Sequence, residues 1–150
     1  MLEDFIEVNK LSAKVFPVRD EVHTAAKAAA AMEGDADAVA KSIVLVASGG
    51  QGIVVVLLGK DKVDLQKVKS VMGVNDVALA SPKEVFGITG YEIGGVPPVS
   101  IYGVATIVDR QLLEKGEVIC GGGDPHHLMR IRVSDIVEFA ENVAIDDVRK

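Results

Sequence analysis

The chain has 150 residues, of which 49% are hydrophobic and 25% are charged, a composition typical of a compact globular protein rather than a disordered one. Its formal net charge of −6 argues against broad nonspecific nucleic-acid binding, although it leaves room for local contact with one end of an RNA. The single cysteine excludes an internal disulfide and indicates a reducing compartment. The acidic N-terminus lacks the basic region of a signal peptide, and no apolar run approaches the roughly 18 residues of a membrane span. We therefore expect one cytoplasmic domain over residues 1–150.

The first part of the chain predicts two helices. Apolar residues recur at loose helical spacing over Asp4–Val15, and Pro17 should end that helix. Thr24 is a suitable N-cap for a second helix over Ala25–Met32, and Gly34 is a suitable stop.

Two strongly apolar runs then predict a β-hairpin. Lys41–Ala47 and Ile53–Leu58 are β-branched and apolar on both parities, so both faces of each strand should be buried. The glycine-rich segment Ser48–Gly52 joins them as the turn.

The middle of the chain predicts two short helices around a short strand. Apolar positions over Val63–Met72 share one helix face, and Gly73 is the stop. Asn75–Ala80 is typical of a short strand. Ser81–Glu84 has the form of a capping box, so a short helix should follow and end at Gly87.

The last third alternates short strands with helical turns. The polar tail, Glu141–Lys150, should pack loosely. In chain order, the other expected elements are a strand pair or one broken strand over Val99–Val108, a helical turn over Arg110–Lys115, strands over Glu117–Cys120 and Leu128–Val133, and a helix over Asp135–Ala140 capped by Ser134.

Two glycine-rich loops stand out as candidate sites. Gly121–His127 opens with three glycines, which let a ligand approach the main chain, and Pro125 stiffens its exit. Such a loop can aim N–H groups at a carbonyl oxygen or a phosphate, but an ordinary turn between strands fits equally well. In the second loop, Gly90–Pro98, Tyr91 offers a hydroxyl and a ring that can stack on a base. A structural crossover is the alternative.

Lys41 is the third candidate, because it begins a strand that should be buried on both sides. It either extends into solvent or lies at the mouth of a cleft with its charge in use. Burial would lower its pKa and a nearby anion would raise it.

Other common chemistries lack their residue patterns. His126 and His127 are adjacent and would point to opposite faces of a strand, so with His23 distant we find no metal-ligand spacing. Cys120 lies in a strand pattern, which favours a buried apolar role over a Cys–His nucleophile. No nucleophile elbow, Walker A motif or dinucleotide-binding motif is present.

Three segments in register resemble the YbaK / prolyl-tRNA-synthetase-associated editing domain family: Val39–Val44, Gly90–Pro98 and Gly121–His127. The resemblance covers about residues 20–140. It implies an α+β fold, a single compact domain with a mixed, barrel-like β-sheet flanked by short helices. It also implies hydrolysis of aminoacyl-tRNA that carries the wrong amino acid, by a free-standing editor or an inserted domain.

The resemblance also implies roles for individual residues. Lys41 matches the lysine that helps to hold the aminoacyl-adenosine end, and His127 falls where some members carry a histidine. Gly121 and Pro125 match a Gly-x-x-x-Pro loop whose backbone N–H groups, including those of Gly122 and Gly123, face the scissile ester. Pro97 stands where many members have serine, which bears on amino-acid specificity. The substrate-binding wall is matched by Tyr91, Gly94, Gly95 and Pro98.

A site of this kind needs no metal, cofactor or triad, because an aminoacyl ester is already activated and needs only an oriented water and a stabilised oxyanion. The resemblance implies that the terminal ribose hydroxyl of the tRNA helps to position that water. We therefore predict a trans-editing deacylase that removes a small amino acid from tRNA-Pro or a related tRNA. Its partners would be the tRNA 3′ acceptor end and an aminoacyl-tRNA synthetase, with no membrane.

Three points stay open at this stage. A non-catalytic module of the same fold, which binds tRNA or a synthetase, is the first alternative, and a thiol enzyme using Cys120 is the second. Four lysines form either a patch for tRNA phosphates or a solvated helix face. They are Lys60, Lys62, Lys67 and Lys69.

Overall fold

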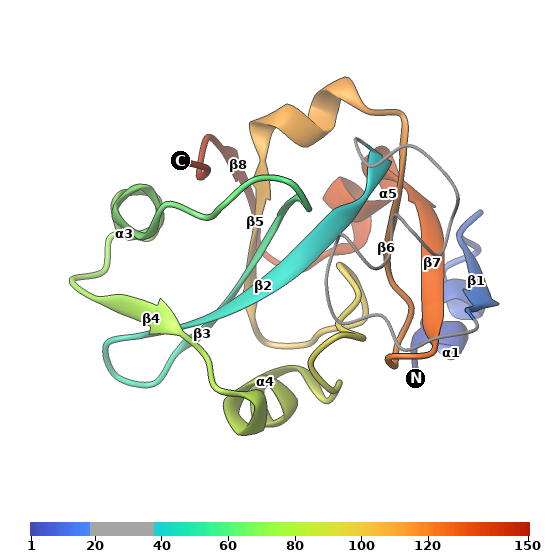
Figure 1. Ribbon diagram of the computed structural model, residues 1–150, viewed down its shortest axis with the longest axis horizontal. Helices are drawn as coiled ribbons and strands as arrows, with labels where there is room; N and C mark the ends of the chain where they lie inside the picture. The colour runs from blue at the N-terminus through green and yellow to red at the C-terminus, as the bar shows by residue number, and fades with distance from the viewer. Residues whose placement is uncertain (19–37) are drawn as a thin grey trace.

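The computed structural model describes residues 1–18 and 38–150 (Figure 1). The predicted helix over Ala25–Met32, with Thr24 and Gly34 at its ends, lies outside these residues. In chain order the elements are α1 (Leu2–Val8), β1 (Lys14–Pro17), β2 (Ala40–Ala47), β3 (Gly52–Leu58), α3 (Leu65–Met72), β4 (Val77–Leu79), α4 (Pro82–Thr89), β5 (Ala105–Asp109), the 3₁₀ helix η2 (Arg110–Glu114), β6 (Glu117–Gly121), β7 (His127–Arg132), α5 (Val133–Phe139) and β8 (Val143–Asp146).

The described strands form two sheets. One has the order β1-β7-β6, and the other has the order β4-β2-β3-β5-β8. The second sheet is mixed, because β2 pairs with β3 and β4 antiparallel while β5 pairs with β3 and β8 parallel. The α+β class, with short helices around a mixed sheet, is confirmed. The sheets stay open and do not close into a barrel.

The core forms on both faces of the five-stranded sheet. The larger cluster lies between the two sheets, where β3 contributes Val54 and Val56 and α5 contributes Ile136. The smaller cluster lies on the other face, where Val68 of α3 packs with Leu57. Every residue of β3 from Ile53 to Leu58 is fully buried, as predicted. Burial of such side chains contributes about 1.5–3 kcal/mol each, which makes β3 the centre of the fold.

In the described part of the chain, a parallel bridge joins the two sheets. It pairs Val39, just before β2, with Ile119 of β6. Both residues are buried in a small cluster with Leu128, and Phe16 and Val18 pack against it. The beginning of β2 therefore lies beside β6, and this brings two of the candidate segments onto neighbouring strands.

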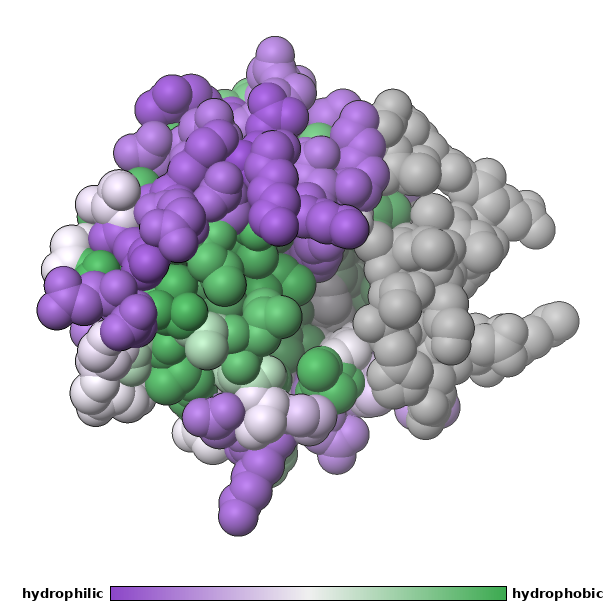
Figure 2. Space-filling view, turned by 60° about the vertical axis from the view of Figure 1, so that its left-hand side comes forward, coloured by the Kyte–Doolittle hydropathy of each residue, from purple (hydrophilic) through white to green (hydrophobic). Residues whose placement is uncertain are grey.

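Some large apolar side chains lie on the surface and not in the core. Leu79 of β4 and Phe86 of α4 are exposed. Figure 2 shows an apolar area, with hydrophilic residues above it, on the side of the molecule that bears these elements. Among the described residues, every helix is too short or too polar to cross a membrane.

The first helix is shorter than the sequence predicts. It ends at Val8, because the backbone turns out of the helix at Lys10, which has φ +55°. Leu11 N–H still donates to Ile6 O at 3.0 Å. The expected end of the helix at Val15 was wrong, since this β-branched residue pairs with Met129 in β1.

Two of the later helices, α4 and α5, have other bounds than predicted. The capping box at Ser81 is present, but α4 continues through Gly87 and ends at Gly90, which adopts the left-handed conformation. Gly87 fits a helix interior because nothing forces a turn there. In the last helix Ser134 is not the cap, since α5 begins at Val133 after Arg132.

The largest corrections concern two C-terminal segments. The predicted strand over Val99–Val108 is reduced to β5, because Ser100 and Gly103 have φ values of +67° and +75° that break extended pairing. The polar tail does not pack loosely. It forms β8 beside β5, and Val148 beyond it is fully buried.

Candidate functional site

The two glycine loops pack against each other backbone to backbone. A Cβ atom at Gly95 would lie 2.5 Å from Asp124 Cα, and one at Gly121 would overlap the carbonyl oxygen of Val96. Gly123 N–H donates to Gly95 O at 2.9 Å and ties the loops together. Glycine is required at these positions because any side chain would separate the loops.

Hydrogen bonds within the protein use several amides of the Gly121–His127 loop. Gly122 N–H donates to His127 O at 3.2 Å, and His127 N–H donates to Asp124 O at 3.2 Å. The expectation that the amides of Gly122 and Gly123 face a scissile ester therefore does not match this geometry. Among residues 1–18 and 38–150 no acceptor is found for the Asp124 N–H, and its nitrogen packs against Gly95.

Asp124 and His127 form a close pair at the contact between the loops. The imidazole Nδ1 lies 2.8 Å and 3.0 Å from the two carboxylate oxygens, and one of those oxygens also accepts His126 N–H at 2.8 Å. Burial pushes the pKa of Asp124 upward, but the hydrogen bonds from His127 and His126 outweigh it and hold the pKa below its usual range. The carboxylate thus fixes Nδ1 and leaves Nε2 for another partner.

Asp124 was not among the residues that the sequence predicted for the site. The local sequence could have predicted a role for Asp124, because an aspartate between glycine and proline commonly accepts a hydrogen bond from the backbone N–H two residues later. Here that donor is the N–H of His126. The spacing of three residues then brings the side chain of His127 to the same carboxylate.

Tyr91 supports the loop from the core side. It is 5% exposed, and its hydroxyl donates to Ser100 Oγ at 2.8 Å. Burial raises its pKa, and the hydrogen bond with Ser100 opposes this only in part. The expectation that its ring is available to stack on a base was therefore wrong for this structure. Pro97 and Pro98 are also buried, while Gly94 turns the loop with φ +89°.

Lys41 lies on the neighbouring strand. Its Nζ donates to Gly59 O at 3.2 Å, and the side chain is half-buried. Burial lowers its pKa, the charge of Asp61 opposes this shift, and the charge of Lys62 adds to it. The sequence left open whether burial or a nearby anion would dominate the pKa of Lys41. In the structure burial dominates, and the pKa is lowered.

Lys41 does not bond to the Gly121–His127 loop in the described residues, and only the pairing of the strands places it near that loop. Its hydrogen bond goes to Gly59 and not to the Gly121–His127 loop. However, Lys41 and Gly121 each stand two residues after the bridge between Val39 and Ile119, on strands that run in the same direction. They are therefore at similar levels of adjacent strands. Next to Lys41 on β2, the Ser42 hydroxyl is buried without a hydrogen-bond partner in the described part of the chain.

Cys120 is placed away from solvent. It is 2% exposed, and its Sγ lies 3.6 Å from Met129 O. Burial raises the pKa of the thiol, so the reactive thiolate is disfavoured. Within residues 1–18 and 38–150, no group of three or more His, Cys, Asp and Glu side chains is arranged to hold a metal ion.

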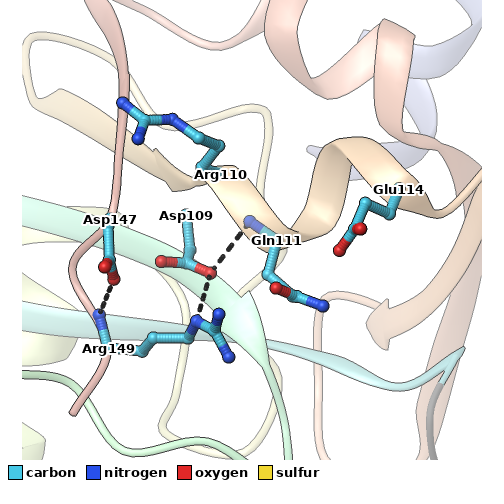
Figure 3. A pocket seen from close by; sticks show the side chains of 6 residues that line it. All are labelled: Asp109, Arg110, Gln111, Glu114, Asp147 and Arg149. Atoms are coloured by element: carbon cyan, nitrogen blue, oxygen red, sulfur yellow. Dashed lines mark hydrogen bonds and ion pairs between the residues drawn. The ribbon is translucent and has the colours of Figure 1, made fainter.

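A separate polar cavity of about 300 Å³ lies where β5, η2 and the C-terminal segment meet (Figure 3). Asp109 is fully buried there and accepts N–H groups of Gln111 and Val148 at 3.2 Å and 3.0 Å. The Arg149 guanidinium lies between Asp109 and Asp61, at 3.8 Å and 4.0 Å. These contacts fix the C-terminal segment against the sheet, and the sequence patterns did not predict them.

Comparison with protein families gives one match over most of the chain. The model of the aminoacyl-tRNA editing domain family matches residues 19–139. Two proline–tRNA ligases are also similar. The enzyme of Halalkalibacterium halodurans is 29% identical over 80 residues, which are 53% of this chain and 14% of the ligase. That of Desulfotalea psychrophila is 29% identical over 85 residues, which are 56% of this chain and 15% of the ligase.

Solved structures extend the similarity to nearly the whole chain. The hypothetical protein APE2540 superposes with a TM-score of 0.91 and 29% identity, over 99% of both chains. A candidate trans-editing enzyme for prolyl-tRNA synthetase gives a TM-score of 0.87 and 28% identity, over 99% of this chain and 94% of the other. The fold is thus shared over nearly the full length of these chains.

Proposed function

Because this chain belongs to the aminoacyl-tRNA editing domain family, we propose that it is a trans-editing deacylase that hydrolyses the ester of a mischarged tRNA. The observation that carries the proposal is the junction of the two glycine loops, where Gly95 contacts Asp124 and Asp124 holds His127. This junction presents a donor amide and an imidazole on a rigid support. The trans-editing description of one structural neighbour supports the same reaction.

The reaction needs only positioning and charge stabilisation. A water oxygen attacks the ester carbonyl carbon, and the carbonyl oxygen gains negative charge, which the Asp124 N–H would stabilise in this proposal. The C–O bond to the terminal ribose then breaks, and the ribose oxygen leaves with a proton taken from the water. His127 Nε2, or the neighbouring ribose hydroxyl, is suited to orient the water and relay that proton. Lys41 would hold the adenosine end.

The substrate side chain would be small. The candidate wall is built from glycines and buried prolines, namely Gly94, Gly95, Pro97 and Pro98. Since the loop bonds hold this wall against the catalytic loop, it has little room to widen for a larger side chain. Exclusion by volume discriminates modestly between similar side chains, so a preference for a small amino acid on tRNA-Pro or a related tRNA is expected.

A deacylation screen over a panel of mischarged tRNAs tests the function. The protein should release a small amino acid from at least one of them, and a chelator should leave the rate unchanged because the proposed chemistry uses no metal. Correctly charged tRNAs serve as controls. Inhibition by chelator that zinc restores would contradict the mechanism, and absence of hydrolysis on every tRNA would favour a binding module.

The thiol-enzyme alternative is tested with Cys120→Ala. Because the sulfur is buried and its pKa raised, the variant should keep most of the activity and lose roughly 1 kcal/mol of unfolding free energy. Chemical denaturation and deacylation rates measure the two effects. A loss of activity approaching about 10³-fold with the fold intact would assign the cysteine a catalytic role.

A further inference from the structure

The C-terminal segment pairs with the chain just before α3. Val63 and Arg149 form an antiparallel bridge, with Asp64 N–H donating to Val148 O at 2.7 Å and Lys150 N–H donating to Lys62 O at 2.8 Å. These two hydrogen bonds flank the bridge. Lys62 and Lys150 are therefore the next opposed pair, although 88 positions separate them in the sequence.

The two lysine side chains share one face. Val63 packs against the cluster under α3, and Arg149 turns inward to Asp109 (Figure 3). Lys62 and Lys150 oppose each other across the bridge, and residues opposed in an antiparallel pair lie on the same side of it. Both are exposed to solvent.

This arrangement places like charges side by side. Like charges that oppose each other directly destabilise a strand pair. Nearby carboxylates are engaged elsewhere, since Asp64 caps α3 and Asp147 pairs with Lys67 at 3.2 Å. Among the described residues, neither Lys62 nor Lys150 has an ion-pair partner. In a chain of net charge −6, two opposed lysines that form no ion pair within the described residues are a feature that a polyanion would neutralise.

The pair is continuous with the candidate site. Lys62 follows Gly59, whose carbonyl accepts Lys41 Nζ, by three residues. After burial and the opposing charge of Asp61, the charge of Lys62 is a further influence on the pKa of Lys41. The charge of Lys62 thus acts on Lys41, and Lys150 lies opposite Lys62 across the backbone bridge.

We propose that Lys62 and Lys150 form a phosphate-binding surface for the acceptor end of tRNA, which guides the 3′ terminus toward Lys41. The inference rests on the proposed function, because it assigns the partner of the same site. Neither lysine touches the reacting ester. Their contribution is to binding of the sugar-phosphate backbone and not to the chemical step.

The test is the double charge reversal Lys62→Glu/Lys150→Glu. On full-length mischarged tRNA its KM should rise about 10-fold or more with kcat unchanged, and the slope of log(kcat/KM) against log(salt concentration) should become shallower by about 1 to 2. On an aminoacyl ester of adenosine, which is too short to reach this surface, Lys150→Glu alone should match wild type, whereas Lys62→Glu also changes the charge near Lys41. Lys14→Glu/Lys83→Glu is the matched control, since it makes the same charge change at exposed lysines elsewhere.

Each contrary result has a distinct meaning. An equal rise of KM in both double variants would reduce the effect to net charge and overturn the inference. A loss on the adenosine ester with Lys150→Glu alone would place that lysine in the reaction site, which also overturns it. If wild type hydrolyses no ester, the proposed function fails. Salt-dependent binding of uncharged tRNA to the same variants then decides whether the surface binds RNA.

Discussion

Lys41→Ala should lower the rate of deacylation by about 10²- to 10³-fold, the loss typical when one preorganised charge is removed from an active site. Its melting temperature should change by only about 2 °C, because within the described residues the lysine makes one hydrogen bond, to Gly59 O, and is half-buried. Single-turnover rates on mischarged tRNA and thermal unfolding measure the two quantities. A large loss of activity without a loss of stability would identify Lys41 as part of the site.

Lys41→Arg is the informative companion variant. It keeps the charge, but a planar guanidinium cannot reproduce the position of a compact ammonium, so the rescue should be incomplete. Unfolding of Lys41→Ala would instead make the lysine structural and remove it from the site. Weakened tRNA binding, in a wild type that hydrolyses no mischarged tRNA, would support the binding-module alternative.

Local signals in the sequence predicted the elements that local interactions form. The hairpin of β2 and β3 follows from two β-branched runs around a glycine turn. The helix α3 ends at Gly73 in the left-handed conformation, and the capping box at Ser81 begins α4. Each of these depends on residues within a few positions, which a sequence pattern records directly.

Long-range pairing was not predictable from local patterns. The last ten residues are polar on average, yet Ile145 pairs with Val108 and Val148 N–H donates to the buried Asp109 at 3.0 Å. A strand of four residues carries too little periodicity to be recognised alone. Its position is determined by the exposed edge of β5 and not by its own sequence.

The candidate site could likewise be predicted from the sequence only in part. Motif positions placed Gly95 and Gly121 in the site, and their backbones do meet across the two loops. The direction of the amides was not predictable, because it depends on which carbonyl each one reaches after folding. Gly123 N–H donates to Gly95 O, and Tyr91 is directed into the core by its bond to Ser100.

Gly121→Ala should be among the most damaging single substitutions in the described chain. The added Cβ would overlap Val96 O and lie 2.8 Å from Val96 C and 3.1 Å from Gly95 C. These are backbone atoms, so no side chain can rotate away and the two loops must separate. We expect a loss of about 2–3 kcal/mol in unfolding free energy. Deacylation measured below the melting temperature should also fall, because Asp124 would lose its support.

Gly87→Ala is the matched control for this substitution. Gly87 lies inside α4 with nothing within 4 Å of an added Cβ, and alanine is favoured over glycine in a helix by about 1 kcal/mol. Its melting temperature should therefore equal or exceed that of wild type, with activity unchanged. If Gly121→Ala matched Gly87→Ala in stability and rate, the close contact of the two loops would not be needed for the fold or the site. A stable but inactive Gly121→Ala would show that the contact serves the reaction alone.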